Sequence, residues 1–294
     1  ASIILSCVFY FYNHSPTTDI YTLSYTTLFR SRNKILEYDE LPQKYGYQAV
    51  TGTRVSENTL YIADRLYTED DFIVSTNANG LKTYKLRSEL PRPTLGGLIG
   101  PGDIKYVDVN GDGVIDSYDQ VRGVGNPSTP EIIYGFGLNA EYKGFYASIF
   151  FQGAGNTSVL LGGATSEGWY PFSWGVDQSN YRTFALDRWT ENNPSQDVII
   201  PRLHKNNANN ANNRVASTWW LRNGSFLRLK LVELGSTVPQ KIVSKWGMSN
   251  LRLYMSSTNL FVLSKFKDWD VELAGNGLNY PLQRVFNIGV NVSF

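Results

Sequence analysis

The amino-acid sequence predicts an all-β protein that supplies the C-terminal strands of an antiparallel transmembrane β-barrel. Apolar residues alternate with small or polar ones along stretches of roughly ten residues, the length that a tilted strand needs to cross a bilayer. The connections between these stretches are short and long in turn, as in outer-membrane barrels. The last stretch ends on an aromatic residue, Phe294.

The alternation is clearest in two neighbouring stretches. In the first stretch, one predicted face carries Ile132, Tyr134, Phe136, Leu138, Ala140 and Tyr142. The opposite face is mostly small or polar and carries Ile133, Gly135, Gly137, Asn139 and Glu141. Lys143-Gly144 predicts a tight turn, after which the apolar face of a second strand carries Phe145, Ala147, Ile149 and Phe151.

Three further strands follow the same period of two. The third is predicted to have Leu227, Leu229 and Leu231 on its apolar face. The fourth has Leu251, Leu253 and Met255 on that face, before Ser257 and Asn259 interrupt it. The fifth is the stretch that ends the sequence, and a sixth, damaged strand is expected around Tyr25–Leu36.

The terminal stretch also predicts an assembly signal. A final aromatic residue with apolar residues at every second position before it is the pattern that the barrel-assembly machinery of the outer membrane reads. The residues of this predicted signal are Phe286, Ile288, Val290, Val292 and Phe294. The same apolar face is expected to contact outer-membrane lipid.

Connection lengths predict which end of the barrel faces outward. Lys143-Gly144 and the moderate link 235–250 are the shorter connections, whereas 36–130, 154–224 and 263–284 are long. Counting back from a periplasmic C-terminus places every long connection outside the cell. Five or six strands are fewer than the roughly eight that the smallest barrel needs, so we expect the sequence to be a fragment.

Composition excludes several function classes. Lys and Arg number 27 and Asp and Glu 26, so nothing favours nucleic acid as a partner. No apolar run reaches the roughly 18 residues of a membrane helix. One cysteine, two histidines and the absence of a recognised catalytic motif predict that the chain is not an enzyme. A soluble β-sandwich also alternates, but long strands with Gly, Asn, Ser and Arg on their polar faces favour a barrel with a wet lumen.

An Asp-rich segment has the spacing of a calcium-binding loop. Oxygen ligands at positions 1, 3, 5, 7, 9 and 12 would come from Asp108, Asn110, Asp112, the Val114 carbonyl, Asp116 and Asp119. Gly113 at position 6 permits the sharp turn. Position 12 is Asp rather than the longer Glu, however, and Gly100-Pro101-Gly102 disfavours a preceding helix. The alternative is an Asx-rich turn that its own hydrogen bonds close.

The loop 154–224 carries the candidate substrate aromatics Trp169, Tyr170 and Trp174. Exposed rings at a barrel mouth can stack on sugar faces, and the alternative is packing within the loop. Trp219-Trp220 is interpreted as part of an interfacial aromatic girdle. Lys205–Asn213 is asparagine-rich and is interpreted as a low-complexity loop. The lumenal Arg228, Lys230 and Arg252 are expected to brace the barrel interior.

The first 31 residues do not fit the rest of the chain. Tyr21–Ser31 resembles translated adaptor sequence from metagenomic assemblies, so we expect residues 1–31 to be non-native. The predicted organisation is then 1–31 as an artefactual N-terminus and 32–130 as a remnant strand with a long extracellular loop that holds the Asp-rich turn. Residues 131–294 are the C-terminal barrel strands with extracellular loops at about 154–224 and 263–284.

Several motifs, in this order, resemble the C-terminal region of SusC/RagA-type TonB-dependent transporters. They are Gly102 to Asp116, Tyr134-Gly-Phe-Gly137, Tyr142-Lys-Gly-Phe145, Phe151-Gln-Gly153, Trp220 to Lys230, and Asn259-Leu-Phe261. The resemblance covers about Arg32 to Phe294. Each motif alone is moderately specific, and their order makes the set highly specific.

The resemblance implies a 22-stranded barrel with an N-terminal plug in the outer membrane of Bacteroidetes-like bacteria. It further implies a SusD-like surface lipoprotein as a lid and import of oligosaccharides or peptides driven by TonB through the N-terminal part. The family supplies no catalytic residues. A chain without plug, TonB-contacting segment and most strands is not transport-competent alone. The alternative from another class is a secreted β-sandwich that binds carbohydrate and carries a calcium loop.

Overall fold

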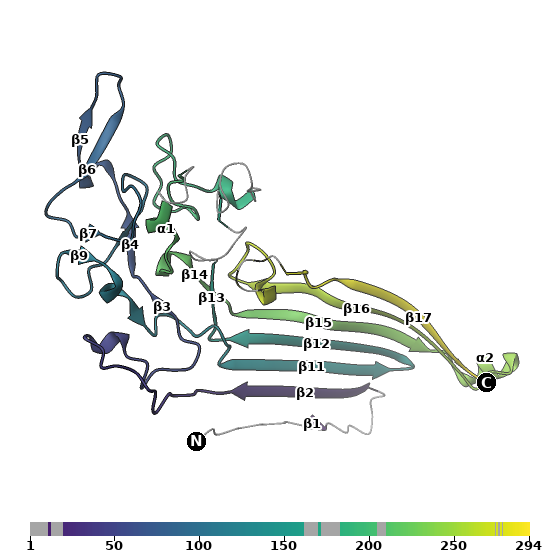
Figure 1. The fold of residues 1–294 in the computed structure, drawn as a ribbon. Coiled ribbons are helices and arrows are strands. Elements are labelled where there is room, and N and C mark those ends of the chain that lie inside the picture. Colours follow the sequence, from purple (N-terminus) through teal and green to yellow (C-terminus); the bar gives the residue numbers. More distant parts are fainter. Residues whose placement is uncertain are drawn as a thin grey trace.

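The computed structural model describes residues 11–12, 20–161, 170–171, 183–204, 210–273, 275, 277 and 279–294. Its main element is one antiparallel sheet of seven strands in the order β1-β2-β11-β12-β15-β16-β17 (Figure 1). The all-β prediction is confirmed. Within the described ranges, no helix is long and apolar enough to cross a membrane.

The strands of the large sheet have the bounds β1 (Phe11–Tyr12), β2 (Ile20–Arg30), β11 (Ile132–Tyr142), β12 (Phe145–Gly155), β15 (Phe226–Thr237), β16 (Asn250–Ser264) and β17 (Val285–Ser293). Five small two-stranded sheets lie in the long connections: β3 (Thr59–Leu60) with β10 (Val121–Arg122), β4 (Ala63–Leu66) with β8 (Ile104–Tyr106), β5 (Phe72–Thr76) with β6 (Lys82–Leu86), β7 (Arg92–Pro93) with β9 (Val114–Ile115), and β13 (Ser158–Leu160) with β14 (Leu221–Asn223).

The helices are all short. The α-helices are α1 (Ala211–Arg214) and α2 (Gln240–Val243). Single 3-10 turns are η1 (Gly46–Gln48), η2 (Glu69–Asp71), η3 (Ser117–Asp119), η5 (Thr183–Leu186), η7 (Thr218–Trp220), η8 (Ser244–Trp246) and η9 (Val271–Leu273).

The turn between β11 and β12 lies where the sequence predicts it. Lys143 and Gly144 both have positive φ, 50° and 83°. Two such residues match the twist of antiparallel strands, so the hairpin closes without splaying them. The hairpin register then pairs Tyr142 with Phe145 and continues without interruption to Ile132 and Gly155.

The register builds rows of side chains across five strands, because directly paired residues share one face of a sheet. One row joins Ala140, Ala147, Leu234, Met255 and Ile288. The next row joins Tyr142, Phe145, Ser236, Leu253 and Val290. We call this side of the sheet the apolar face.

The opposite side, here called the polar face, combines glycine with aromatic and polar residues. Its rows include Glu141, Tyr146, Gly235, Tyr254 and Gly289. A Cβ on Gly235 would lie 2.4 Å from carbons of the Tyr146 ring, and one on Gly289 would lie 2.3 Å from a carbon of the Tyr254 ring. The glycines are therefore required because a tyrosine from the neighbouring strand covers each of them.

One predicted side-chain orientation is wrong. The sequence places Leu231 on the apolar face with Leu229, but Leu229 pairs with Phe151 and Leu231 pairs with Phe150. Phe150 and Phe151 point to opposite faces, so Lys230 is an extra residue at a β-bulge. Leu231 therefore lies on the polar face.

The sixth predicted strand is present but shifted toward the N-terminus. The sequence predicts this strand around residues 25–36, which lie on both sides of the proposed boundary at residue 31. The structure instead pairs β2, which ends at Arg30, with all eleven residues of β11. The whole of β2 therefore lies before the proposed boundary at residue 31, and residues 31–40 form no strand. The non-native origin of residues 1–31 stays a prediction.

The long connections gather at one end of the sheet and form a loop body with its own core (Figure 1). Leu66, Ile104, Ile115, Ile200 and Trp220 are at most 1% exposed within it. The β11–β12 turn and α2 lie at the other end of the strands (Figure 1). The largest described hydrophobic core thus belongs to loops, and the sheet extends from it as a single layer.

Candidate functional site

The apolar face of the sheet is exposed along its length. Leu138, Phe145 and Ile288 are 59%, 66% and 85% exposed. In the described part of the chain, no second sheet packs against it, contrary to the β-sandwich alternative. An apolar area of this extent marks contact with a membrane or another protein.

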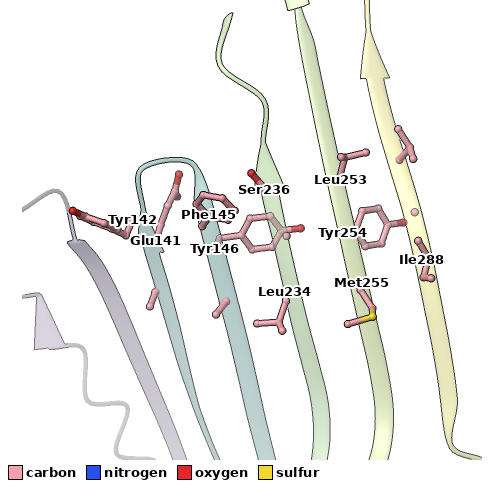
Figure 2. A pocket seen from close by; sticks show the side chains of 15 residues that line it. Glu141, Tyr142, Phe145, Tyr146, Leu234, Ser236, Leu253, Tyr254, Met255 and Ile288 are labelled. Carbon is pink, nitrogen blue, oxygen red and sulfur yellow. The ribbon is translucent and has the colours of Figure 1, made fainter. Parts of the chain in front are cut away.

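A groove of about 870 Å³ lies at the turn end of this sheet (Figure 2). Its lining includes Leu234, Leu253, Met255 and Ile288, which belong to the rows of the apolar face. Tyr142 and Phe145 lie at the same end, at the hairpin turn. Aromatic rings flanking an aliphatic band are typical of a barrel at the membrane–water boundary. The groove is therefore part of a lipid-facing surface.

The polar face carries a charged brace between neighbouring strands. Arg252 donates hydrogen bonds to the Tyr146 hydroxyl at 2.7 Å and to Glu233 Oε1 at 2.6 Å. The guanidinium also lies 4.2 Å from the centre of the Tyr146 ring. These contacts join β12, β15 and β16, which is the bracing role expected for Arg252.

A second arginine attaches a long loop to the sheet. Arg228 on β15 is buried and donates from Nε to Glu272 at 2.5 Å and from Nη2 to Asp270 at 2.6 Å. Both carboxylates belong to the connection between β16 and β17. Arg228 thus fixes that loop over the end of the strands.

The loop body is organised around one buried carboxylate that the sequence analysis did not single out. Asp103 is 1% exposed. Its carboxylate accepts hydrogen bonds from Arg202 Nη2 at 2.5 Å, Asn213 Nδ2 at 2.8 Å and the Gly100 amide at 2.9 Å, and lies 3.1 Å from His204 Nε2. This one side chain therefore joins three segments of the chain, namely residues 100–103, residues 202–204 and α1.

The asparagine-rich segment is part of this network. Asn210, Asn212 and Asn213 are each at most 2% exposed. Asn213 accepts the Ile104 amide at 2.8 Å, and Asn212 donates to the Ile104 carbonyl at 2.8 Å. The interpretation of this segment as low-complexity loop is wrong for residues 210–213, because α1 begins there and the amides of Asn212 and Asn213 bond buried backbone groups. Residues 205–209 lie outside the described residues.

The predicted aromatic sites receive different outcomes. Tyr170 is buried, and its ring meets Trp220 edge to face at 5.7 Å, so it has no face open to a substrate. Trp169 and Trp174 lie outside the described residues. Trp220 is fully buried and donates to the Asn213 carbonyl at 2.9 Å, and Trp219 donates to the Ile199 carbonyl at 3.0 Å. The girdle interpretation of this pair is wrong, since both rings pack in the loop body.

The Asp-rich loop is closed by its own hydrogen bonds. Asp108 accepts from the amides of Gly111 and Gly113, both at 2.7 Å. Asp112 accepts from the Val114 amide at 2.9 Å. Asp119 is fully buried and accepts from the amides of Val109 at 2.8 Å and Asp116 at 2.9 Å. This is the arrangement of successive Asx turns.

Every predicted side-chain ligand of the calcium loop takes part in these hydrogen bonds. Asp116 accepts from the Tyr118 amide at 2.7 Å, and Asn110 accepts from Asp112 at 2.9 Å, so each predicted side-chain ligand bonds a nearby amide. In the part of the chain that the structure describes, three or more His, Cys, Asp or Glu side chains nowhere gather into a group that could hold a metal ion. These hydrogen bonds are those of the Asx-rich turn that the sequence offers as the alternative, and the calcium role stays a prediction.

A second ionic cluster joins the sheet to the loop body. Glu131, one residue before β11, is buried and accepts from Arg54 at 2.8 Å, Arg32 at 3.2 Å and Asn156 at 3.2 Å. Burial raises the pKa of the Glu131 carboxyl, but the hydrogen bonds from these three partners outweigh it and hold the pKa below its usual value. Glu131 is thus an anchor where the barrel strands enter the loops.

A polar groove of about 500 Å³ lies on the loop body. Its lining combines carboxylates with an indole and a guanidinium: Asp64, Asp187, Asp197, Trp219 and Arg222, together with Ala63, Gln196, Val198, Ile199 and Thr218. Burial lowers the pKa of Arg222 and raises that of Asp268, which lies near it. The sequence analysis did not identify this groove, because its residues come from four separate segments.

The residues of the predicted assembly signal lie on β17 and just after it. Phe286, Ile288, Val290 and Val292 pair with apolar-face residues of β16 or with Ser257. Phe294 is 90% exposed. This face continues the apolar face to the edge of the sheet, and the assembly role stays a prediction.

The chain has sequence relatives among known proteins, although no family model matches it. "TonB-dependent receptor P26" of Formosa agariphila is 30% identical over 245 residues, 78% of this chain and 23% of that protein. "TonB-dependent receptor P3" of the same organism is 27% identical over 215 residues, 68% of this chain and 20% of that protein.

Solved structures show the same fold. The RagAB peptide importer in the closed-closed state has a TM-score of 0.65 and 20% identity over 99% of this chain and 29% of the other. The open-open state gives a TM-score of 0.63 and 19% identity over 98% of this chain and 28% of the other. This chain therefore spans between a fifth and a third of the length of each of these proteins.

A single-layer sheet with one exposed apolar face and a loop body at one end defines part of an outer-membrane β-barrel. The chain is part of a TonB-dependent receptor, as its sequence similarity shows, and it shares the fold of the RagAB peptide importer. Its location is accordingly the bacterial outer membrane. The names of the similar proteins are those of receptors and importers, which supports a non-enzymatic role, and their organism accords with a Bacteroidetes origin.

Proposed function

We propose that the chain is part of an outer-membrane transporter that imports oligosaccharides or peptides with a SusD-like lipoprotein as lid and with energy from TonB. The observation that carries this proposal is the attachment of a folded loop body to the end of membrane-spanning strands. A pore for small solutes needs only a constriction. A separately folded body with its own core provides a large surface for a bulky substrate or a partner.

The arrangement of the two faces supports transport. The apolar face contacts lipid, and the polar face, with Arg252 and Glu233, lines the lumen. An open sheet of seven strands encloses no pore, so import requires the remaining wall of the barrel. TonB and the plug act through the N-terminal part of the full-length receptor in this proposal.

The solved structures that share this fold are of the RagAB peptide importer, and the peptide substrate is a property of that protein. For this chain both oligosaccharides and peptides are candidate substrates. The loop body, on the extracellular side, contributes to the substrate entrance and to the contact with the lipoprotein.

The test uses the full-length receptor gene, expressed with its neighbouring genes in a Bacteroidetes host that lacks them. Growth on defined glycans and on peptides as sole nutrient is measured with and without TonB. We expect growth on one of the two classes that disappears without TonB, and a lipoprotein that co-purifies with the receptor. Equal growth with and without the receptor gene on every nutrient would refute the proposal.

We also propose that Phe294 and the alternate residues before it direct barrel assembly. Replacing Phe294 by Ala in the full-length receptor is expected to reduce the heat-modifiable, assembled form in outer-membrane fractions. Phe261→Ala is the matched control, because Phe261 lies on the apolar face of β16 and is also exposed. Equal loss in both variants would indicate a general requirement for apolar rings rather than a signal.

A further inference from the structure

The polar groove on the loop body has the chemistry of a ligand site. We propose that it binds one or two neutral sugar residues of an oligosaccharide, with Trp219 as the stacking surface and Asp187 and Arg222 as hydrogen-bonding groups. This inference rests on the proposed function, since it names the substrate class for which the loop body forms an entrance. Its volume of about 500 Å³ falls in the range of small-ligand sites.

The walls of the groove are fixed before any ligand arrives. Gln196 accepts the Leu66 amide at 2.8 Å and donates to the Leu66 carbonyl at 3.3 Å, which ties its segment to β4. Thr218 accepts the Ala63 amide at 2.8 Å and ties η7 to the same strand. A binding surface that is already ordered loses little conformational entropy when it binds.

The indole of Trp219 is held by its polar edge. Its Nε1 donates to the Ile199 carbonyl at 3.0 Å, and both residues line the groove. Trp219 as a whole is half-buried: it packs against the core of the loop body and also lines the groove. A fixed, partly open ring that is surrounded by polar groups suits the apolar face of a pyranose.

Charges of both signs line the groove, and this determines the ligand class. Asp64 forms an ion pair with Lys105 at 3.0 Å. Asp187 uses one carboxylate oxygen, Oδ2, to accept a hydrogen bond from the Ile199 amide at 3.3 Å. Arg222 uses Nη1 for the carbonyls of Trp219 and Leu221. Among the described residues, its Nε and Nη2 donate to no protein acceptor.

A negatively charged ligand is therefore disfavoured, because it meets the carboxylates of Asp187 and Asp197. A lone positive charge satisfies the carboxylates but offers no acceptor to Arg222. A hydroxyl group both donates and accepts, so it can donate to a carboxylate and accept from the guanidinium at once. Each hydroxyl of a neutral polyol satisfies both kinds of group, whereas an ammonium only donates and a carboxylate only accepts.

The test measures binding to the full-length receptor, purified in detergent with any co-purifying lipoprotein. The probes for calorimetry are neutral hexasaccharides of the malto, laminari, xylo and manno series, with trilysine and hexagalacturonate as charged counterparts. We expect at least one neutral series to bind. Asp187→Asn and Trp219→Ala should each weaken its binding about tenfold or more, because each removes a principal contact.

Matched variants separate binding from folding. Trp246→Ala is the control for Trp219→Ala, because Trp246 is 67% exposed in the connection at the opposite end of the strands. Asp187→Asn is nearly isosteric and can still accept the Ile199 amide, so the loop body should keep its protease resistance. If Trp219→Ala loses binding and protease resistance together, that variant is set aside, and the affinity of Asp187→Asn decides.

Three results would overturn the inference. They are binding of no neutral series, unchanged affinity in Asp187→Asn and Trp219→Ala, or preferential binding of a charged probe that these variants weaken. TonB-dependent growth is measured in parallel on the same nutrients. Growth on peptides without sugar binding would reject the sugar site and leave the transport function standing, whereas loss of all receptor-dependent growth would reject that function itself.

Discussion

Asp103 provides the sharpest test of how the loop body is stabilised. The change is Asp103→Ala in the full-length receptor. It removes the acceptor for Arg202, Asn213 and the Gly100 amide at once. Removing one partner of a buried ion pair costs about 3–5 kcal/mol, because the other charge stays buried without compensation. The Arg202 side chain keeps 22% of its exposure, so the lower end of that range, about 3 kcal/mol, applies here.

That loss predicts a large change in local opening. Each 1.4 kcal/mol is about a factor of ten in an equilibrium, so the open loop body should become about a hundredfold more populated. When opening is fast relative to cleavage, protease attack follows this population. Trypsin treatment of intact cells should therefore cut the loop body about a hundredfold faster. The barrel itself should remain heat-modifiable, because no strand pairing of the sheet involves Asp103.

Two comparisons make the result interpretable. Asp70→Ala removes an equal charge from an exposed residue of η2 and should leave the cleavage rate unchanged. Asp103→Asn keeps a carbonyl acceptor for the Gly100 amide but loses the ion pair, so its rate should lie between those of Asp103→Ala and wild type. Cleavage of Asp103→Ala at the wild-type rate would refute the view that this carboxylate holds the loop segments together.

Three further predictions concern other parts of the molecule. Hydrogen bonds from Arg65 lower the pKa of the Asp71 carboxyl against the effect of burial. The ionised carboxylate therefore stabilises the fold above the unfolded pKa of about 3.9, and this stabilisation is lost as the pH falls through the lowered pKa of the folded state. Hydrogen-exchange protection of η2 and β5 should thus be weaker in Asp71→Asn than in wild type at pH 6, and the difference should vanish near pH 2; a constant difference would contradict this. Gly235→Ala should lower the urea midpoint of the barrel by displacing the Tyr146 ring, whereas Gly155→Ala, whose new Cβ meets its nearest atom at 3.6 Å, should not. For the Asp-rich loop, its internal hydrogen bonds lead us to expect unchanged loop proteolysis after calcium is removed with a chelator, and calcium-specific anomalous scattering at Asp108 would contradict this expectation.

The sheet was predictable because its information is local. A period of two between Ile132 and Tyr142 specifies a strand with two unlike faces, and Lys143-Gly144 specifies the turn. The bulge at Lys230 was not predictable on the same grounds. Leu229 and Leu231 are both apolar, so the sequence fits a regular strand as well as a bulged one, and only pairing with Phe150 and Phe151 decides.

The loop body was not predictable because its information is not local. Asp103 binds Arg202 and Asn213, which lie 99 and 110 residues away in the chain. Asparagines that serve as buried hydrogen-bonding groups look the same in sequence as asparagines of a solvated loop. The groove around Trp219 is built in the same way from distant segments, so no spacing in the sequence indicates it.

The two halves of the molecule are stabilised by different surroundings, and this separates their roles. The sheet exposes its apolar face to lipid, so its stability depends on the membrane and on neighbouring strands. The loop body buries Leu66, Ile104 and Trp220 in a core of its own and is independent of lipid. Substitutions in the loop body can therefore change its surface without disturbing the pairing of the strands. In the described part of the chain, Arg228 and Glu131 form ionic contacts that join the two halves, so a movement of the loop body relative to the sheet requires these contacts to break or to move with it.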